Sequence, residues 1–306
     1  MTTHDRRARI DALGYDYAAQ PKAPVDRCNL CGHDVFVGLT HRDRYGYPAA
    51  AQACARCGLV TLHPRMTAEA YGRFYDGVYR PLVSAFHGRL IDAVTIQDEQ
   101  RVYAAERAAL MAPVLTPGVH RTMLDIGGST GVVAAHFAQA FGLAGTLIDP
   151  APLEVEQARR LGLETITGLV EAHDFGDRTF DVVIICQTVD HLLDVAGVLH
   201  RVRRLLSAEG RLFIDIVDFR AAYLRNWSIE EAVKIDHPYY LTQDTMSAYL
   251  ARTGFDVRRV DYAADHLHVS YVCAPGPVQA DALPSPRRVA AALDEMRFVQ
   301  NAPRSR

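Results

Sequence analysis

The sequence predicts an α/β fold in which a doubly wound, mostly parallel sheet follows a small four-cysteine module. Two observations predict it: strand and helix patterns alternate from residue 121 onward, and two C-x-x-C-G pairs lie near the N-terminus. The chain has 306 residues, of which 49 % are apolar and 23 % charged, the balance of an ordinary globular protein. This composition excludes intrinsic disorder, a collagen-like fibre and a disulfide-dense mini-protein as descriptions of the whole chain.

The N-terminal residues 1–25 are polar, and we expect them to form a flexible arm. They lack the apolar stretch of a secretory signal. Nowhere does an apolar run approach the roughly 20 residues that a membrane helix needs. We therefore expect a cytoplasmic protein with no membrane span. Nothing in the sequence specifies an oligomeric state.

The four-cysteine module is predicted over residues 26–62. Cys28, Cys31, Cys54 and Cys57 form two pairs with 22 residues between them. Two short turns can bring four thiolates to a tetrahedral centre, the geometry that Zn²⁺ prefers. Four protein ligands leave no open position, so we expect a structural zinc. Two disulfides or four free thiols are the alternatives, and disulfides conflict with a cytoplasmic protein.

A helical linker is predicted over residues 63–118, with helical periodicity over 68–79 and 91–111. At the other end of the chain, prolines precede a tail over 276–306 that contains a short helix. Tyr79 of the linker is a candidate pocket residue, although its helix face has a plain packing explanation as well.

The core is predicted over residues 119–275. Its strands are expected at 121–127, 145–150, 163–168, 181–187, 211–217, 256–262 and 266–273. Its helices are expected at 132–141, 152–161, 195–206 and 243–253. The connection between the last two strands is so short that it requires a hairpin, which makes one strand antiparallel.

A glycine-rich turn ends the first strand of the core. It reads Asp125-Ile-Gly127-Gly128-Ser-Thr-Gly131, and a helix begins directly after it. The turn lacks the G-x-G-x-x-G dinucleotide fingerprint and the Gly-Lys-Ser/Thr of a phosphate-binding loop. An acid inside the turn repels a pyrophosphate but suits a ligand that carries an ammonium group. Asp149, 24 residues later at the end of the second strand, is placed to accept both hydroxyls of a ribose.

These residues resemble the first motifs of the class I S-adenosylmethionine-dependent methyltransferases, over about residues 120–275. The resemblance implies a seven-stranded Rossmann-like sheet whose last strand is antiparallel. It also implies that Asp125 and the glycines serve the methionine part of S-adenosylmethionine, and that Asp149 binds its ribose. The cofactor-binding residues that it implies are Asp125, Gly127, Gly128, Gly131, Asp149, Pro150, Leu169, Val170, Cys186 and Gln187.

The acceptor side is predicted in the segment from Lys234 to Tyr240, which reads Lys-Ile-Asp-His-Pro-Tyr-Tyr. A hydroxyl, or a carbon beside a keto group, must lose a proton when it accepts a methyl group, and histidine is the usual base. His237 is therefore the candidate base, and Asp236 beside it favours basicity. Lys234 is a candidate for holding a phosphate or carboxylate of the substrate. The plain alternatives are that His237 packs in a loop and that Lys234 is a surface lysine.

The order of zinc module, helical linker and methyltransferase core is similar to that of sugar methyltransferases in deoxysugar and polysaccharide pathways. Their C-methyltransferases carry a Tyr-His-Glu-His-x-x-Tyr segment, in which the second histidine is the proposed base. Here Lys234-Ile235 replace the leading Tyr-His, while Asp236, His237 and Tyr240 match the acid, the base and the last tyrosine. The resemblance implies a sugar or glycan acceptor, with linker tyrosines closing the site and His191 facing the acceptor.

Three other functions remain open alternatives: an rRNA or tRNA methyltransferase whose zinc module grips RNA, a methyltransferase of secondary metabolites, and a non-catalytic scaffold. Nucleic acid is disfavoured because the net charge is −3 and no basic stripe with interleaved aromatics is present. After the fourth strand, Gln187-Thr-Val-Asp stands where base N-methylases carry an Asn-Pro-Pro-Tyr type of loop. The intact Asp125 and Asp149 argue against a scaffold.

Overall fold

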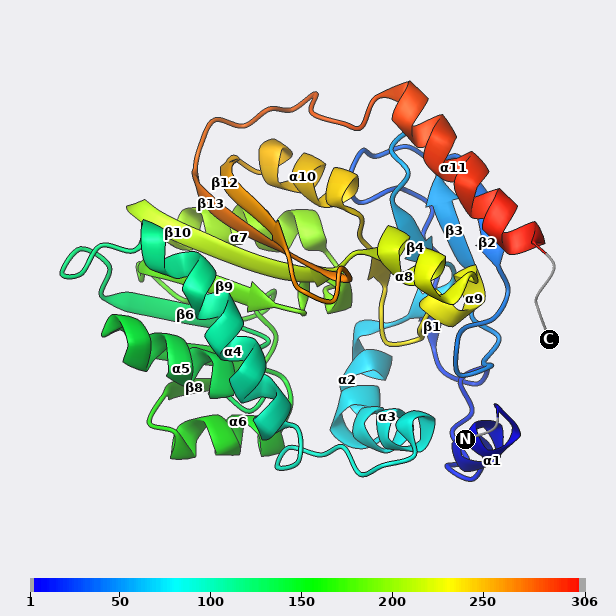
Figure 1. The fold of residues 1–306 in the computed structure, drawn as a ribbon, viewed down its shortest axis with the longest axis horizontal. Helices are drawn as coiled ribbons and strands as arrows, with labels where there is room; N and C mark the ends of the chain where they lie inside the picture. Colours follow the sequence, from blue (N-terminus) through cyan, green and yellow to red (C-terminus); the bar gives the residue numbers. More distant parts are fainter. Residues whose placement is uncertain (1–2, 303–306) are drawn as a thin grey trace.

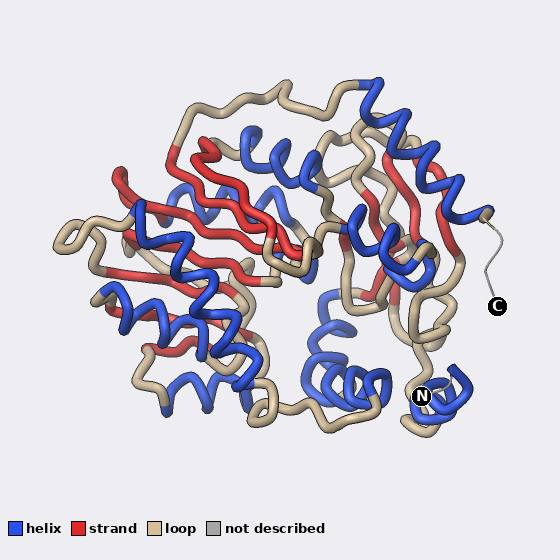
Figure 2. Tube along the Cα trace, viewed as in Figure 1, coloured by secondary structure: helices blue, strands red, loops and turns tan. Residues whose placement is uncertain are grey.

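The structure, a computed structural model, describes residues 3–302. Figure 1 shows two sheets beside each other, with helices α2 and α3 lying on one side of the space between them. The same arrangement appears in Figure 2, where one group of helices lies around the larger sheet and another lies near the smaller one. Among the described residues, no helix combines the length and the apolar character that crossing a bilayer requires.

The larger sheet has seven strands in the order β12-β13-β10-β9-β6-β7-β8. Only β13 is antiparallel to its two neighbours, β10 and β12, and the other pairs are parallel. The predicted Rossmann-like sheet and its antiparallel last strand are therefore confirmed. That strand lies inside the sheet, between β10 and β12. The strands are β6 (Thr122–Ile126), β7 (Ala144–Asp149), β8 (Glu164–Thr167), β9 (Phe180–Cys186), β10 (Leu206–Val217), β12 (Phe255–Tyr262) and β13 (His268–Pro275).

Helices cover both faces of this sheet, because its central strands are apolar on both sides. In β9, Val182 and Ile184 face one apolar cluster while Val183 and Ile185 face another, as the two-residue period of a strand requires. The first cluster lies under α4 (Gln97–Met111), α5 (Val132–Phe141) and α6 (Pro152–Arg160). The second lies under α7 (Val195–Leu205) and α10 (Gln243–Arg252).

The smaller sheet has four strands in the order β11-β4-β3-β2. Its last strand comes from the core: Tyr239 pairs with Thr61 and Tyr240 pairs with Val60. The segment with the candidate base thus runs beside the four-cysteine module. The strands are β2 (Phe36–Thr40), β3 (Ala51–Cys54), β4 (Val60–Leu62) and β11 (Tyr239–Tyr240), and β1 (Lys22–Ala23) pairs separately with β5 (Arg65–Met66).

The N-terminal residues differ from the predicted flexible arm. Helix α1 occupies Thr3–Asp11, and Ile10 and Tyr17 are only 2 % and 1 % exposed. Both side chains pack in one cluster with Leu39 of the small sheet. The segment is mostly polar, so its composition did not indicate that these two apolar side chains are buried. Their burial ties the segment to the rest of the molecule.

The linker and tail also differ in detail from the prediction. Two helices, α2 (Ala68–Gly77) and α3 (Tyr79–His87), replace the single helix expected over 68–79. The second linker helix, α4, begins at Gln97 and not at 91. The tail helix α11 (Pro286–Asn301) has 16 residues and crosses the small sheet (Figure 1). Its buried residues follow helical spacing: Val289, Leu293, Met296 and Val299.

The remaining helices lie on connections near the two sheets. They are the short helices η1 (Ala112–Val114) and η2 (Val189–His191), and the helices α8 (Phe219–Asn226) and α9 (Ile229–Ala232). The helix η2 follows β9 directly and α8 follows β10, so both lie at the carboxyl ends of central strands. Parallel α/β sheets place their ligand sites at this edge.

Candidate active site

The glycine-rich turn after β6 has the backbone that its sequence predicts. Gly127 and Gly131 adopt φ values of 68° and 77°, which favour glycine, and Ser129 is held at 51°. A Cβ atom on Gly128 would lie 2.3 Å from Oδ2 of Asp125, so glycine leaves room for that carboxylate. At Gly131 a Cβ would lie 2.7 Å from Cβ of Ala158, so this glycine lets α5 approach α6.

Two acidic side chains end the neighbouring strands β6 and β7. Asp125 is 1 % exposed, and neither of its carboxylate oxygens has a hydrogen-bond partner among the described residues. Burial, and then the charge of Asp149, raise the pKa of Asp125 to about 8. A buried carboxylate without a partner is unfavourable unless a cationic group accompanies it. The site thus fits a ligand with an ammonium group.

The second acid is already oriented by the backbone. Oδ2 of Asp149 accepts the N–H of Ser129 at 2.9 Å, and Oδ1 accepts the N–H of Ala151 at 2.9 Å. Burial raises the pKa of Asp149 to about 6, and these hydrogen bonds oppose the rise. Pro150 follows directly and begins the turn into α6. Each carboxylate oxygen keeps a free lone pair, which suits the two hydroxyls of a ribose.

The other predicted cofactor residues surround the same edge of the sheet, with one exception. Leu169 is 42 % exposed after β8, whereas Val170 is 4 % exposed and packs into the core. Only Leu169 of the two is therefore free to flank an adenine. Cys186 is half-buried at the end of β9, and Gln187 is exposed with a φ of 51°.

The candidate base lies in a buried cluster of charged groups. His237 is 6 % exposed, and its Nδ1 lies 2.9 Å from Oδ2 of Asp190. Its Nε2 lies 3.3 Å from Oδ2 of Asp236 and 3.4 Å from Nζ of Lys234. Burial alone would raise the pKa of Asp190, but its ion pair with His237 lowers that pKa well below the usual range. Asp190 is therefore ionised, and it fixes the ring of His237 from the Nδ1 side.

A second histidine packs against the first. The ring centroids of His191 and His237 are 4.5 Å apart. Nδ1 of His191 lies 2.6 Å from the Tyr75 hydroxyl and 3.0 Å from the backbone oxygen of Asp236, to which that hydroxyl also donates. Both contacts suit a proton on Nδ1, which leaves Nε2 as an acceptor. Burial, and then His237, lower the pKa of His191 to about 4, so this imidazole is neutral at pH 7.

The remaining predicted acceptor residues have different surroundings. The ring of Tyr79 lies 6.4 Å from that of His191, within the cluster. The Tyr240 hydroxyl donates to the backbone oxygen of Lys234 at 2.6 Å and accepts its N–H at 2.9 Å. The two hydrogen bonds of Tyr240 thus stabilise the loop that carries His237. Burial lowers the pKa of Lys234.

Sequence reasoning missed Asp190 and Tyr75 as parts of this cluster. Asp190 directly precedes the candidate His191 after the carboxyl end of β9. Because ligand sites lie at this edge of a parallel sheet, that position could have indicated a site residue. For Tyr75, nothing in the sequence distinguishes this linker tyrosine from a residue that only packs a helix. It stands four residues before Tyr79, yet its hydroxyl reaches both His191 and the backbone of Asp236.

Arg80 of the linker also contacts the glycine-rich turn of residues 125–131, which is the candidate cofactor loop. Its Nε donates to Oε1 of Glu154 at 2.9 Å, and its Nη2 donates to the Ser129 hydroxyl at 3.2 Å. That hydroxyl in turn donates to Oε2 of Glu154 at 3.0 Å. Because Tyr79 precedes Arg80 in α3, one helix contacts the histidine cluster and the cofactor loop together.

The four predicted metal ligands lie together. Their Sγ atoms are all within 4.8 Å of one another, with 3.4 Å between Cys28 and Cys57 and 3.5 Å between Cys31 and Cys54. Tetrahedral zinc with Zn–S bonds of about 2.3 Å separates its sulfurs by roughly 3.8 Å. The cluster is thus compatible with a zinc ribbon. The glycines after the two pairs, at 32 and 58, have φ values of 72° and 77°.

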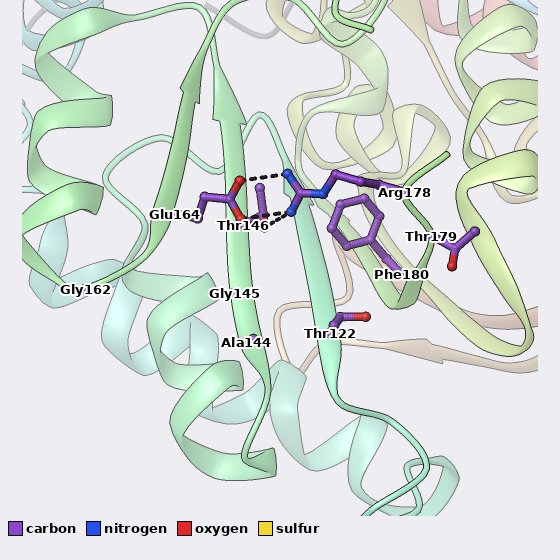
Figure 3. A pocket seen from close by; sticks show the side chains of 9 residues that line it. All are labelled: Thr122, Ala144, Gly145, Thr146, Gly162, Glu164, Arg178, Thr179 and Phe180. Atoms are coloured by element: carbon purple, nitrogen blue, oxygen red, sulfur yellow. Dashed lines mark hydrogen bonds and ion pairs between the residues drawn. The ribbon is translucent and has the colours of Figure 1, made fainter. Parts of the chain in front are cut away.

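A cavity of about 360 Å³ lies at the opposite edge of the large sheet. Its lining includes the first residues of β6, β7, β8 and β9. Figure 3 shows Arg178 and Glu164 facing each other across it, with 2.7 Å between Nη1 and Oε1. It is remote from the glycine-rich turn, because that turn follows the carboxyl end of β6.

The family described as "Methyltransferase domain" matches residues 96–260. A ubiquinone biosynthesis O-methyltransferase of Methylocella silvestris is 34 % identical over 97 residues, which are 30 % of this chain and 38 % of that protein. A ubiquinone/menaquinone biosynthesis C-methyltransferase of Klebsiella pneumoniae is 31 % identical over 109 residues, which are 32 % of this chain and 43 % of that protein. The match with these curated relatives spans less than half of their length.

Two solved structures share the fold. The complex between the Haloferax volcanii Trm112 methyltransferase activator and a putative methyltransferase aligns with a TM-score of 0.52 at 15 % identity, over 68 % of this chain and 98 % of that one. The mitomycin 7-O-methyltransferase MmcR aligns with a TM-score of 0.51 at 21 % identity, over 67 % and 60 %. Because the family match spans more than half of the 306 residues, the chain belongs to the methyltransferase-domain family.

Proposed function

We propose that the chain is an S-adenosylmethionine-dependent methyltransferase that methylates a hydroxyl or carbon of a sugar or glycan, with His237 as the general base. The observation that carries this proposal is the buried pair of His237 and Asp190 beside the cofactor loop. The hydroxyl of Thr188, two residues before Asp190, donates to the backbone oxygen of Gly127 at 3.2 Å. An acceptor between the loop and the histidines therefore lies within reach of both the base and the cofactor.

S-adenosylmethionine, when bound, supplies an electrophilic methyl group on its sulfonium. Asp190 holds the Nδ1 proton of His237, which leaves Nε2 to take the proton of the acceptor. Asp236, 3.3 Å from Nε2, then stabilises the imidazolium. Lys234 lies 3.4 Å from the same nitrogen and stabilises negative charge on the acceptor. Neutral His191 accepts a hydrogen bond from a neighbouring hydroxyl of the acceptor through Nε2.

We also propose a structural Zn²⁺ bound by Cys28, Cys31, Cys54 and Cys57. The sulfur separations support it, and so do the turns that follow each pair. In those turns the N–H of Gly32 donates to the oxygen of Cys28 at 2.8 Å, and that of Gly58 to the oxygen of Cys54 at 2.9 Å. Four thiolates leave no position for substrate, so this metal holds the module together and takes no part in methyl transfer.

A second candidate acceptor is a phenolic metabolite. Two curated relatives are named for ubiquinone biosynthesis. Tyr75 and Tyr79, whose ring centroids lie 5.4 Å apart beside His191, offer an aromatic wall to such a ring. A phenol needs less help than a sugar hydroxyl to lose its proton, since its pKa is about 10.

Transfer of labelled methyl groups into three separated pools tests these proposals. The pools are nucleotide sugars with glycans, phenolic and quinone extracts, and total RNA. We expect label in the sugar pool that disappears in the His237→Gln variant. Label in the phenolic pool alone would support the second candidate acceptor, and label in RNA alone would contradict both.

The Asp125→Asn substitution is expected to weaken binding of S-adenosylmethionine and to raise the thermal stability of the ligand-free enzyme. The raised pKa of about 8 means that folding disfavours the Asp125 carboxylate, so its contribution to stability falls as pH rises from about 4 to 8. Asparagine removes that buried charge, and with it the group that meets the ligand's ammonium. Calorimetric binding and thermal unfolding at pH 8 measure the two effects.

Asp181→Asn is the matched control for this prediction. Asp181 accepts the backbone N–H of Arg121 at 2.8 Å and the Ser207 hydroxyl at 3.0 Å, far from the cofactor loop. Hydrogen bonds hold the pKa of Asp181 below its usual value although burial opposes them. Its replacement should lower stability and leave cofactor affinity unchanged. A loss of stability in Asp125→Asn would show that this carboxylate has a structural role.

A further inference from the structure

Four side chains, from three parts of the chain, gather around the ring of Phe86 at the end of α3. The guanidinium carbons of Arg6 and Arg44 lie 4.2 Å and 4.1 Å from the ring centroid. The rings of His87 and Tyr45 lie 5.1 Å and 5.4 Å from it. Three groups that carry or can carry positive charge thus contact one aromatic ring. They are Arg6 of α1, Arg44 of the β2–β3 connection and His87 of α3.

This cationic cluster adjoins the loop of the candidate base. The backbone N–H of Arg44 donates to the oxygen of Val233 at 2.9 Å, and Oδ2 of Asp43 accepts the N–H of Ile235 at 3.0 Å. Residues 43 and 44 therefore flank Lys234. Burial lowers the pKa of His87, and the charges of Arg44, Arg89, Lys234 and Arg6 lower it further. His87, Arg44 and Lys234 therefore lie near enough to affect one another, and Asp236 and Asp190 are the acids that act on Lys234.

Arg44 has no internal counter-ion in the part of the chain that the structure describes. No carboxylate oxygen lies within 4.0 Å of its guanidinium, and its Nε is buried without a hydrogen-bond partner. Arg107 shows the contrast, because this buried arginine is paired with Asp215 and Glu106. Arg6 reaches a carboxylate, that of Glu231, only at 3.9 Å. A buried guanidinium donor without a partner is costly, and an anionic ligand satisfies it.

We propose that Arg44 and Lys234 form an anion-binding subsite for a phosphate or carboxylate group carried by the acceptor. This inference rests on the proposed function, since the anion belongs to the sugar that His237 activates. The planar fork of Arg44 suits two oxygens of one anionic group, and Lys234 adds a point charge nearer the base. The acceptor is then a sugar phosphate, including a nucleotide-linked sugar, or a uronic acid. A neutral sugar lacks the group that this subsite binds.

Binding of three probes to the full-length enzyme tests the subsite: glucose 1-phosphate, glucuronic acid and uncharged glucose, each measured by titration calorimetry. We expect at least one charged probe to bind about tenfold or more tightly than glucose. Arg44→Gln and Lys234→Gln should each remove that preference, and Arg44→Lys should restore part of it. Arg42→Gln is the control, because Arg42 is exposed in the same connection and its Nη1 donates to the oxygen of Gly46.

The preferred charged probe distinguishes a phosphate from a carboxylate. Affinity for S-adenosylmethionine serves as the folding check for every variant. Equal binding of all three probes to the wild type, or charged-probe binding that survives both Arg44→Gln and Lys234→Gln, would overturn the subsite. Neither result would affect the sugar labelling that tests methyl transfer. A charge preference that depends on Arg44, with no label in the sugar pool, would uphold the subsite and overturn the sugar acceptor.

Discussion

His237→Gln is expected to slow methyl transfer by about 10²–10⁴-fold, the usual contribution of a general base. Glutamine keeps the polarity and approximate size of the side chain but cannot take a proton from the acceptor. The affinity for S-adenosylmethionine should not change, because Asp125 and Asp149 lie on β6 and β7, whereas His237 lies in the loop before β11. Single-turnover transfer of labelled methyl, with cofactor affinity measured in parallel, gives both quantities.

The control for this substitution is His200→Gln. His200 lies exposed on α7, away from the cluster, so its replacement should leave transfer unchanged. A His237→Gln enzyme that retains wild-type turnover would remove His237 from the reaction. Reduced transfer together with reduced cofactor affinity would instead indicate a disturbed fold.

Asp190→Asn should have a smaller effect with a distinct signature. Its carboxylate lies 2.9 Å from Nδ1 of His237 and is ionised, because the ion pair lowers the pKa of Asp190 despite burial. Without that charge the imidazolium is less stable, so the acid limb of the kcat profile should move to lower pH. His191, whose pKa is lowered to about 4, stays neutral over most of this range. A loss of activity without a shift of the profile would point to a structural role for Asp190.

The glycine-rich turn and the two acids that we propose for cofactor binding could be located from the sequence because their signals are local. Asp125 and the glycines share one turn, and Asp149 ends the next strand, so their spacing follows from one βαβ unit. The four cysteines were equally readable, because two short turns repeat one pattern. In each case residues close in the sequence form the site. The acids require only that the alternation of strand and helix be recognised, and the cysteines only that the repeated turn be recognised.

The acceptor half depends on contacts that no spacing encodes. Asp236, the sequence neighbour of His237, was expected to be its partner, yet Asp190 from another connection lies closer. Tyr75 reaches His191 across 116 positions of the chain. The strand β11 consists of two residues, too short for a periodic pattern, and still it pairs the segment after α9 with β4 of the smaller sheet. The burial of Tyr17 and of α11 likewise arises from tertiary packing that overrides local composition.

Cys54→Ser is expected to remove the bound zinc and, with it, most of the methyl transfer. Apparent zinc-binding free energies of four-ligand sites reach about 10–16 kcal/mol in small peptides, as large as the whole stability of a typical domain. The module is too small to keep its turns in place without that contribution. Metal analysis should find one zinc per wild-type chain and little in the variant, whose thermal unfolding should begin at a lower temperature.

Loss of the zinc should disturb the proposed acceptor site before it disturbs the proposed cofactor site. Asn29, inside the first cysteine pair, accepts the N–H of Ala196 at 3.1 Å and the Tyr249 hydroxyl at 2.9 Å, and donates to Asp194 at 2.8 Å. It therefore holds the start of α7, five residues after Asp190. On the other side of the module, β4 pairs with β11, two residues after His237. Release of the cysteine turns should therefore loosen both supports of His237 and Asp190, the pair that we propose for catalysis.

Asp125 and Asp149 end strands of the large sheet, so cofactor affinity should fall far less than methyl transfer when zinc is lost. Cys273→Ala provides the control, because this buried cysteine of β13 lies outside the cluster. It should keep the zinc and most of the activity. Wild-type enzyme that holds no zinc, or that keeps its activity and stability after chelation, would contradict the assignment. Cofactor affinity lost in parallel with transfer would instead mean that the metal supports the whole fold.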